Sequence, residues 1–303
     1  MDAVNTRNVM EFLVILTILV LGFVAITQAT GIEIVTVGPL YMFTPAIAGL
    51  LVCLHNRIAL QDVGLRIGRR RWLALAAVLP LPVLGTITAI SIGVPGVMFN
   101  SSFDMAAELG LPSGPFWTLI ALGGMVAIGA TVNAVAGFGE EFEWRGYLLW
   151  KLAPLGFWKA SLAIGTVWGV WHAPLIVTGY NYPSFPIVGV FALTIACISM
   201  SPLFIYIAVR SQSVVPAAIF HGVFNAVGLV GYAATDDAVL RQLVASEGGV
   251  IGVTVFGIIA AVIALTGTPH LSSDIFTHSS PDAPSLDMEE IHSARNSDAA
   301  GEQ

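Results

Sequence analysis

Apolar runs of about 20 residues recur along this 303-residue chain, and they restrict it to a membrane-embedded fold. Only helices and closed barrels satisfy their backbone hydrogen bonds inside a bilayer, and no alternation typical of barrel strands recurs here. About eight spans are predicted, near residues 9–30, 34–54, 72–92, 116–138, 160–178, 187–209, 214–233 and 249–267. We therefore predict an all-α, polytopic membrane bundle.

Composition separates this bundle from a C-terminal tail. The chain is 56% hydrophobic and only 10% charged, whereas about a quarter of the residues in a soluble domain are charged. The formal net charge of −7 arises mostly in residues 268–303, which are rich in Ser, Pro, Asp and Glu. Such a segment cannot bury enough apolar area to order itself. We predict one membrane domain over residues 1–267 and a disordered, acidic cytoplasmic tail over residues 268–303.

Basic residues predict the side on which each loop lies. Five arginines stand in the connection from His55 to Arg71, and the positive-inside rule makes that connection cytoplasmic. Counting spans from it places both termini and residues 140–159 and 210–213 on the same side. The outer loops are mainly acidic. We predict a multi-pass protein of the cell membrane, with cytoplasmic N- and C-termini and a retained first helix.

Three carboxylates and a guanidinium follow directly on the apolar run that ends near residue 138. A charge at the centre of a spanning helix costs roughly 2.5–3.5 kcal/mol on insertion scales, so these groups should face the bundle interior and line a polar cavity. Glu141 and Arg145 are four residues apart in the favoured order, which predicts a structural ion pair. Glu140 lies on a different helix face, so it is not expected to join this pair and is free to take part in a reaction. Glu143 is expected to reach the cytoplasmic interface.

Two further polar motifs lie inside predicted spans. His172 precedes Pro174, which kinks a helix. His221 and Asn225 are four residues apart and share one helix face. Taken singly, His172 is explained by packing, and the His221–Asn225 pair by hydrogen bonding between helices. An acid, two histidines and an amide on three helices together favour a functional site, because polar groups inside membranes are usually functional.

These motifs, in this order, resemble the CAAX prenyl protease type II family of intramembrane endopeptidases, also called CPBP or Abi. Residues 137–149 are similar to the Gly-x-Gly-Glu-Glu-x-x-Trp-Arg-Gly-Tyr-Leu-Leu motif of its bacterial branch. Residues 171–174 fit Trp-His-x-Pro, and residues 220–225 fit Phe-His-x-x-x-Asn. The resemblance covers roughly residues 131–231. Trp168 stands where Phe is commoner in the family, and this departure is expected to touch no candidate catalytic atom.

The resemblance implies an enzyme that hydrolyses peptide bonds near the cytoplasmic membrane face. Glu140 matches the catalytic glutamate, and His172 matches the histidine of the second motif. His221 and Asn225 match the third motif. Glu141 and Arg145 match the supporting pair.

Two mechanisms remain open for such a protease. In the favoured, metal-free mechanism, Glu140 activates a water that His172 orients, while His221 and Asn225 donate to the oxyanion. In the alternative, Glu140, His172 and His221 bind a zinc ion that keeps one position open for water. A His-Glu-x-x-His pair is absent and Asn is a poor zinc ligand. No cofactor is therefore expected, with zinc as the alternative.

Other functions fit the same residues. A non-catalytic immunity or scaffold protein would retain the pocket, and a proton-coupled transporter could use the acid and histidines as a relay. Transporters usually contain repeats with matched broken helices, which this sequence lacks. The expected partners are the lipid bilayer and a membrane-associated peptide or protein substrate, and nucleic acid is not expected. The substrate is left open among a prenylated tail, a leader peptide, a bacteriocin-like peptide and a membrane regulator.

Overall fold

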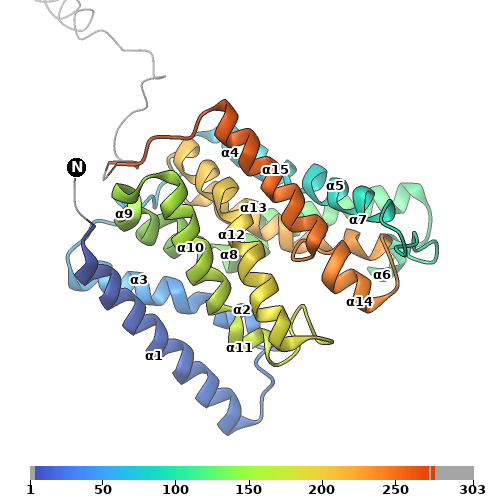
Figure 1. Cartoon of the computed structure of the whole chain (residues 1–303), viewed down its shortest axis with the longest axis horizontal. Helices are drawn as coiled ribbons and strands as arrows, with labels where there is room; N and C mark the ends of the chain where they lie inside the picture. Colours follow the sequence, from blue (N-terminus) through green and yellow to red (C-terminus); the bar gives the residue numbers. More distant parts are fainter. Residues whose placement is uncertain (1–3, 273, 277–303) are drawn as a thin grey trace, which may run out of the picture.

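The computed structural model describes residues 4–272 and 274–276, and this part of the chain is helical without strands. Within it, seven helical segments are long and apolar enough to cross a membrane. Figure 1 shows them gathered into one bundle. The segments are α1 (Thr6–Thr30), α2 with α3 (Gly38–Tyr41, Phe43–His55), α4 with α5 (Arg70–Val78, Pro80–Ile92), a long run from α7 to η3 (Pro115–Leu155), α12 (Pro186–Ser211), α13 with η4 (Val215–Val227, Gly228–Ala233), and α14 to α15 (Ala238–Leu240, Val250–Thr266). The prediction of an all-helical membrane bundle is confirmed.

The remaining predicted span, at residues 160–178, is formed by two shorter helices. α10 (Phe157–Trp171) has 15 residues, which corresponds to about 22 Å, less than the roughly 30 Å of the hydrocarbon core. The helix is interrupted at His172, and α11 (Ala173–Ile176) follows with Pro174 in its first turn. The interruption places His172 between two helices.

The long run is 41 residues, about 60 Å of helix. It contains α7 (Pro115–Ile128), η1 (Gly129–Asn133), α8 (Ala134–Glu141), η2 (Phe142–Leu148), α9 (Leu149–Leu152) and η3 (Ala153–Leu155). Its η1 and η2 segments have π-helical geometry, which is frequent at functional sites. Because the helix continues to Leu155, the charged stretch lies within the bundle and not at its boundary.

Two ends of the bundle can be distinguished by their charge. At the basic end, Arg69 N donates to Ser211 O (3.0 Å) and Val214 N to Gly64 O (3.1 Å). The basic residues at this end are Arg7, Arg57, Arg66, Arg69, Arg70, Arg71, Lys151, Lys159 and Arg210.

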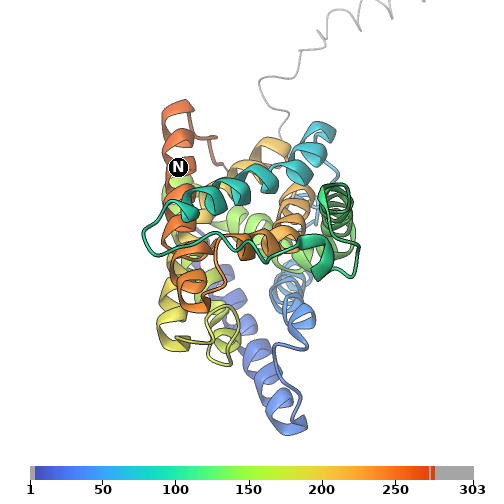
Figure 2. The ribbon, with the colours of Figure 1, turned by 90° about the vertical axis from the view of Figure 1, so that its right-hand side faces the viewer.

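At the opposite, acidic end, Asn100 N donates to Ala233 O (3.1 Å), and the Tyr182 hydroxyl donates to Gly248 O (2.8 Å). These contacts join the connections 93–114, 177–185 and 233–249. α6 (Met105–Glu108) belongs to the first of them. Figure 2 shows the Thr30 end of α1 projecting beyond the other helices. The acidic residues at this end are Glu33, Asp104, Glu108, Asp236, Asp237 and Glu247.

The first residues of the predicted disordered tail pack onto the basic end. Leu271, Ile275 and Phe276 are buried, and Arg66 Nη1 donates to the Phe276 carbonyl. Ordered packing therefore extends past residue 267, because three apolar side chains find a surface there. The other residues of the predicted tail, 277–303, lie outside the described part.

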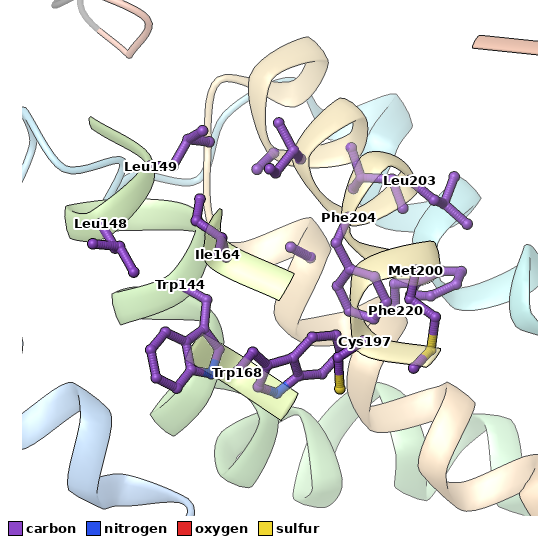
Figure 3. Close-up of a cluster of buried hydrophobic side chains, with 14 of the residues drawn as sticks. Trp144, Leu148, Leu149, Ile164, Trp168, Cys197, Met200, Leu203, Phe204 and Phe220 are labelled. Carbon is purple, nitrogen blue, oxygen red and sulfur yellow. The ribbon is translucent and has the colours of Figure 1, made fainter. Parts of the chain in front are cut away.

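Aromatic side chains fill the core between η2, α10, α12 and α13. Figure 3 shows Trp144, Trp168, Phe204 and Phe220 converging there from these elements. All four are buried. This cluster forms the apolar wall behind the charged residues of α8 and η2.

Candidate functional site

Glycines let the helices that carry the polar motifs approach closely. A Cβ on Gly169 of α10 would lie 2.4 Å from Thr194 Cα of α12, and one on Gly165 would also strike the α12 backbone. This Gly-x-x-x-Gly spacing is typical of tightly packed membrane helices. On the other side, a Cβ on Gly222 of α13 would lie 2.4 Å from Ala134 N. Small residues thus fix α10 against α12, and α13 against the long helix.

The four candidate catalytic residues line one cavity of about 280 Å³. Glu140 enters from α8, His172 from the break between α10 and α11, and His221 and Asn225 enter from α13. Glu140 is 1% exposed and His221 is 5% exposed, whereas Asn225 is exposed. The structure therefore brings together the residues that the sequence placed on three separate helices.

Glu141 and Arg145 form a fully buried ion pair. Arg145 Nη1 donates to Glu141 Oε1 at 2.9 Å, and both side chains are 0% exposed. His221 Nδ1 lies 2.8 Å from the same oxygen. The guanidinium stacks between two aromatic rings, 4.2 Å from the centroid of Trp168 and 4.3 Å from that of Phe204. The predicted i, i+4 contact is present, and it extends to a histidine 80 positions away in the chain.

The Glu140 carboxylate is oriented by a tryptophan. Trp168 Nε1 donates to Glu140 Oε2 at 2.6 Å, while Glu140 Oε1 lies 4.0 Å from His221 Nε2. The expectation that Trp168 touches no candidate catalytic atom is wrong, because its indole supplies an N–H that a phenylalanine lacks. The signal was in the sequence, since Trp168 stands one turn before His172 on the same helix face.

Hydrogen bonds assign the tautomers of the two histidines. His172 Nδ1 lies 2.9 Å from the Trp168 carbonyl oxygen, which can only accept. His221 Nδ1 faces the Glu141 carboxylate. In each ring Nδ1 is therefore assigned the proton, and Nε2 of the neutral imidazole is an acceptor. In both residues, Nε2 is therefore the ring nitrogen that is free to contact a water or a substrate.

Glu143 does not reach the membrane interface. Its side chain is 0% exposed, and a Cβ on Gly49 of α3 would lie 1.6 Å from its Oε2. Neither carboxyl oxygen has a hydrogen-bond partner among the described residues. The expectation was wrong because η2 continues the helix inward, where α3 covers this face.

As placed in this structure, the candidate zinc ligands are farther apart than the ligands of a zinc centre. Within residues 4–272 and 274–276, no group of three or more His, Cys, Asp or Glu side chains is placed to hold a metal. Two ligands of a tetrahedral zinc lie about 3.3 Å apart, whereas Glu140 Oε1 and His221 Nε2 are 4.0 Å apart.

The fold and the cavity define a multi-pass helical membrane protein with a buried glutamate–histidine site. Residues 115–227 match the model of a known family, described as type II CAAX prenyl endopeptidase Rce1-like. This chain carries a domain of that family, which confirms the resemblance seen in the sequence. The match runs from α7 through α13 and includes all six candidate site residues. No curated protein and no solved structure matched the chain.

Proposed function

We propose that this protein is an intramembrane endopeptidase that cleaves peptide bonds with a water activated by Glu140. The observation that carries the proposal is the cavity in which Glu140, His172, His221 and Asn225 meet within a type II CAAX prenyl endopeptidase domain. A buried carboxylate with one oxygen free for a water is suited to act as a general base.

The first step places the water against Glu140 Oε1, since Oε2 accepts from Trp168. His172 Nε2 accepts the second hydrogen bond of this water. The water oxygen bonds to the carbonyl carbon of the substrate while its proton moves to Glu140. The same proton then passes to the amide nitrogen as the carbon–nitrogen bond breaks, so that a carboxylic acid and an amine are released.

The oxyanion of the tetrahedral intermediate needs donors. Asn225 supplies an amide N–H from its exposed position in the cavity. His221 donates from Nε2 only when its ring is doubly protonated, and the Glu141 carboxylate at its Nδ1 supplies the compensating charge. Loss of one such donor typically lowers the rate about 10²–10³-fold.

The test compares the membrane peptides of cells that produce the wild type, Glu140→Gln or His172→Ala. Glu140→Gln keeps the size of the side chain and an oxygen that accepts from Trp168, so that folding is preserved while the base is removed. We expect a set of cleaved termini to be present with the wild type and absent with both variants. Glu108→Gln, at an exposed position outside the cavity, serves as the matched control and should leave the set unchanged.

Identical peptide sets in wild type and Glu140→Gln, at equal protein levels in the membrane, would contradict the proposal and favour a non-catalytic scaffold. The metal-free form of the mechanism has its own test. Cleavage by the purified protein should persist in 1,10-phenanthroline, with no stoichiometric zinc by elemental analysis. If cleavage is lost in 1,10-phenanthroline and added zinc restores it, the metal mechanism would replace the metal-free one.

A further inference from the structure

Two helix interruptions contact each other beside the catalytic cavity, and the first separates α2 from α3. α2 ends at Tyr41 and α3 begins at Phe43, with Pro45 in its first turn. Proline has no N–H, so the Tyr41 carbonyl, four residues earlier, lacks its helical donor. The Thr44 hydroxyl donates to that carbonyl at 2.8 Å. Tyr41 and Thr44 are therefore joined where α2 passes into α3, and both are buried.

The second interruption, between α10 and α11, leaves the Trp171 carbonyl in need of a donor. In a continuous helix this carbonyl would accept from Leu175 N, but here Leu175 N donates to His172 O at 3.0 Å. The Tyr41 hydroxyl supplies the donor, at 2.8 Å from Trp171 O. This bond joins residues 130 positions apart, and it fixes the peptide that leads into His172.

The Trp171 side chain is held by the same two residues. Its Nε1 donates to Thr44 Oγ1 at 3.1 Å, and its ring stacks on Tyr41 with the centroids 4.6 Å apart. The His172 ring packs edge-on against Trp171, with the centroids 4.7 Å apart. Neither Tyr41 nor Thr44 is among the residues that line the catalytic cavity. The residue before His172 is thus held, by backbone and side chain, from outside the cavity.

The same junction contacts the helix that carries the candidate base. A Cβ on Gly139 would lie 2.8 Å from Met42 O, so α8 packs directly on the backbone between α2 and α3. Residues 41–44 therefore contact both the residue before Glu140 and the residue before His172. This segment lies outside the part of the chain that matches the family model.

We propose, building on the protease function above, that Tyr41 and Thr44 are positioning residues for His172. Their hydroxyls hold Trp171, and through it they set where the His172 ring stands relative to Glu140. Neither hydroxyl touches the substrate. The catalytic arrangement of the family domain then depends on a segment that precedes the domain in the chain.

The bond from Tyr41 decides which turn forms at the second interruption. With the Trp171 carbonyl held by Tyr41, Leu175 N is free to donate to His172 O, and His172 Nδ1 stays on the Trp168 carbonyl. Without the Tyr41 hydroxyl, the Trp171 carbonyl competes for Leu175 N, because a buried carbonyl requires a donor. The turn then shifts, and the His172 ring leaves its acceptor.

Kinetics of the purified protein test the effect on catalysis. The substrate is a synthetic peptide spanning one Glu140-dependent cleavage site, found by comparing membrane peptides as above. Tyr41→Phe keeps the ring and removes the hydroxyl. We expect kcat to fall about tenfold or more, since small displacements of catalytic groups lower rates strongly. KM should stay within about twofold, because Tyr41 does not line the cavity.

Three further variants separate positioning from packing. Tyr147→Phe is the matched control, because it removes another buried hydroxyl–carbonyl bond, to Asn8 O at 3.1 Å, and Tyr147 does not line the cavity. It should leave kcat within about twofold of wild type. Thr44→Val keeps the shape but removes the hydroxyl, so kcat should fall as in Tyr41→Phe. Thr44→Ser restores the hydroxyl and should retain at least about half of the wild-type kcat.

Nitrogen NMR of the protein labelled in its histidine rings tests the positioning without requiring activity. His172→Ala identifies the His172 signals by their loss. In the wild type, Nδ1 should have the shift of a protonated nitrogen and Nε2 that of a bare one. In Tyr41→Phe and in Thr44→Val we expect the two shifts to approach each other, as both tautomers become populated. Tyr147→Phe should reproduce the wild-type spectrum.

Unchanged His172 shifts, or an unchanged kcat, in folded Tyr41→Phe would overturn the inference while leaving the protease function standing. If Tyr41→Phe does not fold, the same two measurements on Thr44→Val decide. A fall in kcat that Tyr147→Phe shares would also overturn it, because the loss would then come from packing alone. If the wild type cleaves no Glu140-dependent site, the protease function itself fails, and the NMR shifts still decide whether Tyr41 positions His172.

Discussion

Removing Arg145 alone should destabilise the protein more than removing Arg145 and Glu141 together. Their contact of 2.9 Å is 0% exposed on both sides, and the guanidinium is enclosed by the rings of Trp168 and Phe204. Arg145→Met keeps most of the packing volume but leaves Glu141 buried with only His221 as a partner. Breaking a buried pair in this way costs about 3–5 kcal/mol.

The double variant Arg145→Met/Glu141→Leu buries no unpaired carboxylate. Its main loss is the acceptor of His221 Nδ1, and an unsatisfied buried donor costs about 1–3 kcal/mol. The double variant should therefore be about 2 kcal/mol more stable than Arg145→Met alone.

The measurement is reversible unfolding of the purified protein in mixed micelles, by titration with a denaturing detergent. Arg71→Met, at an exposed position, is the control and should change the free energy of unfolding by less than about 0.5 kcal/mol. A double variant whose loss equals the sum of the two single losses would refute the reasoning, because it would mean that the two charges do not depend on each other.

Three further predictions concern the contacts around the site. Trp168→Phe keeps the packing but removes the N–H that binds Glu140, so the rate of substrate cleavage should fall about 10–100-fold, the kinetic equivalent of about 1.4–2.7 kcal/mol; a rate within twofold of wild type would contradict the orienting role. Gly169→Leu should force α10 from α12, because its Cβ would already strike the α12 backbone; a loss of unfolding free energy below about 1 kcal/mol, measured in mixed micelles, would contradict this contact. Gly49→Ala should destabilise by about 1–3 kcal/mol, because its Cβ would meet the Glu143 carboxyl. The loss should shrink when Glu143→Ala is also present, and equal losses in both backgrounds would disprove the contact.

Contacts within one helix could be predicted from the sequence, whereas contacts between helices could not. The Glu141–Arg145 pair follows from a spacing of four on a helix, and the structure contains it. The bond from His221 to Glu141 joins residues 80 positions apart. It depends on how closely α13 approaches the long helix, which glycines such as Gly222 decide. The pattern indicated that the polar groups should meet but not which oxygen each would use.

The two errors in the site have separate physical causes. Glu143 was assigned to the interface because the apolar run ends near residue 138, yet the helix continues to Leu155 and carries Glu143 beneath Gly49. Helix length is set by packing against neighbours as well as by hydropathy. Trp168 was treated as an aromatic substitute for phenylalanine, but a buried indole N–H usually finds an acceptor. Here that acceptor is the candidate base.

The environments of the three carboxylates in this stretch separate their roles more sharply than the motif does. Glu141 is neutralised by Arg145 and bonded to His221, so it has no capacity left to accept a proton from water. Glu143 packs against Gly49 of α3 and is not among the residues that line the catalytic cavity. Of these three carboxylates, only Glu140 lines the cavity. Its Oε2 accepts a hydrogen bond from Trp168, and its Oε1 lies 4.0 Å from His221 Nε2. Since a general base must reach the water it deprotonates, these environments support our proposal that Glu140 is the base, while Glu141 contacts His221 and Glu143 packs against α3.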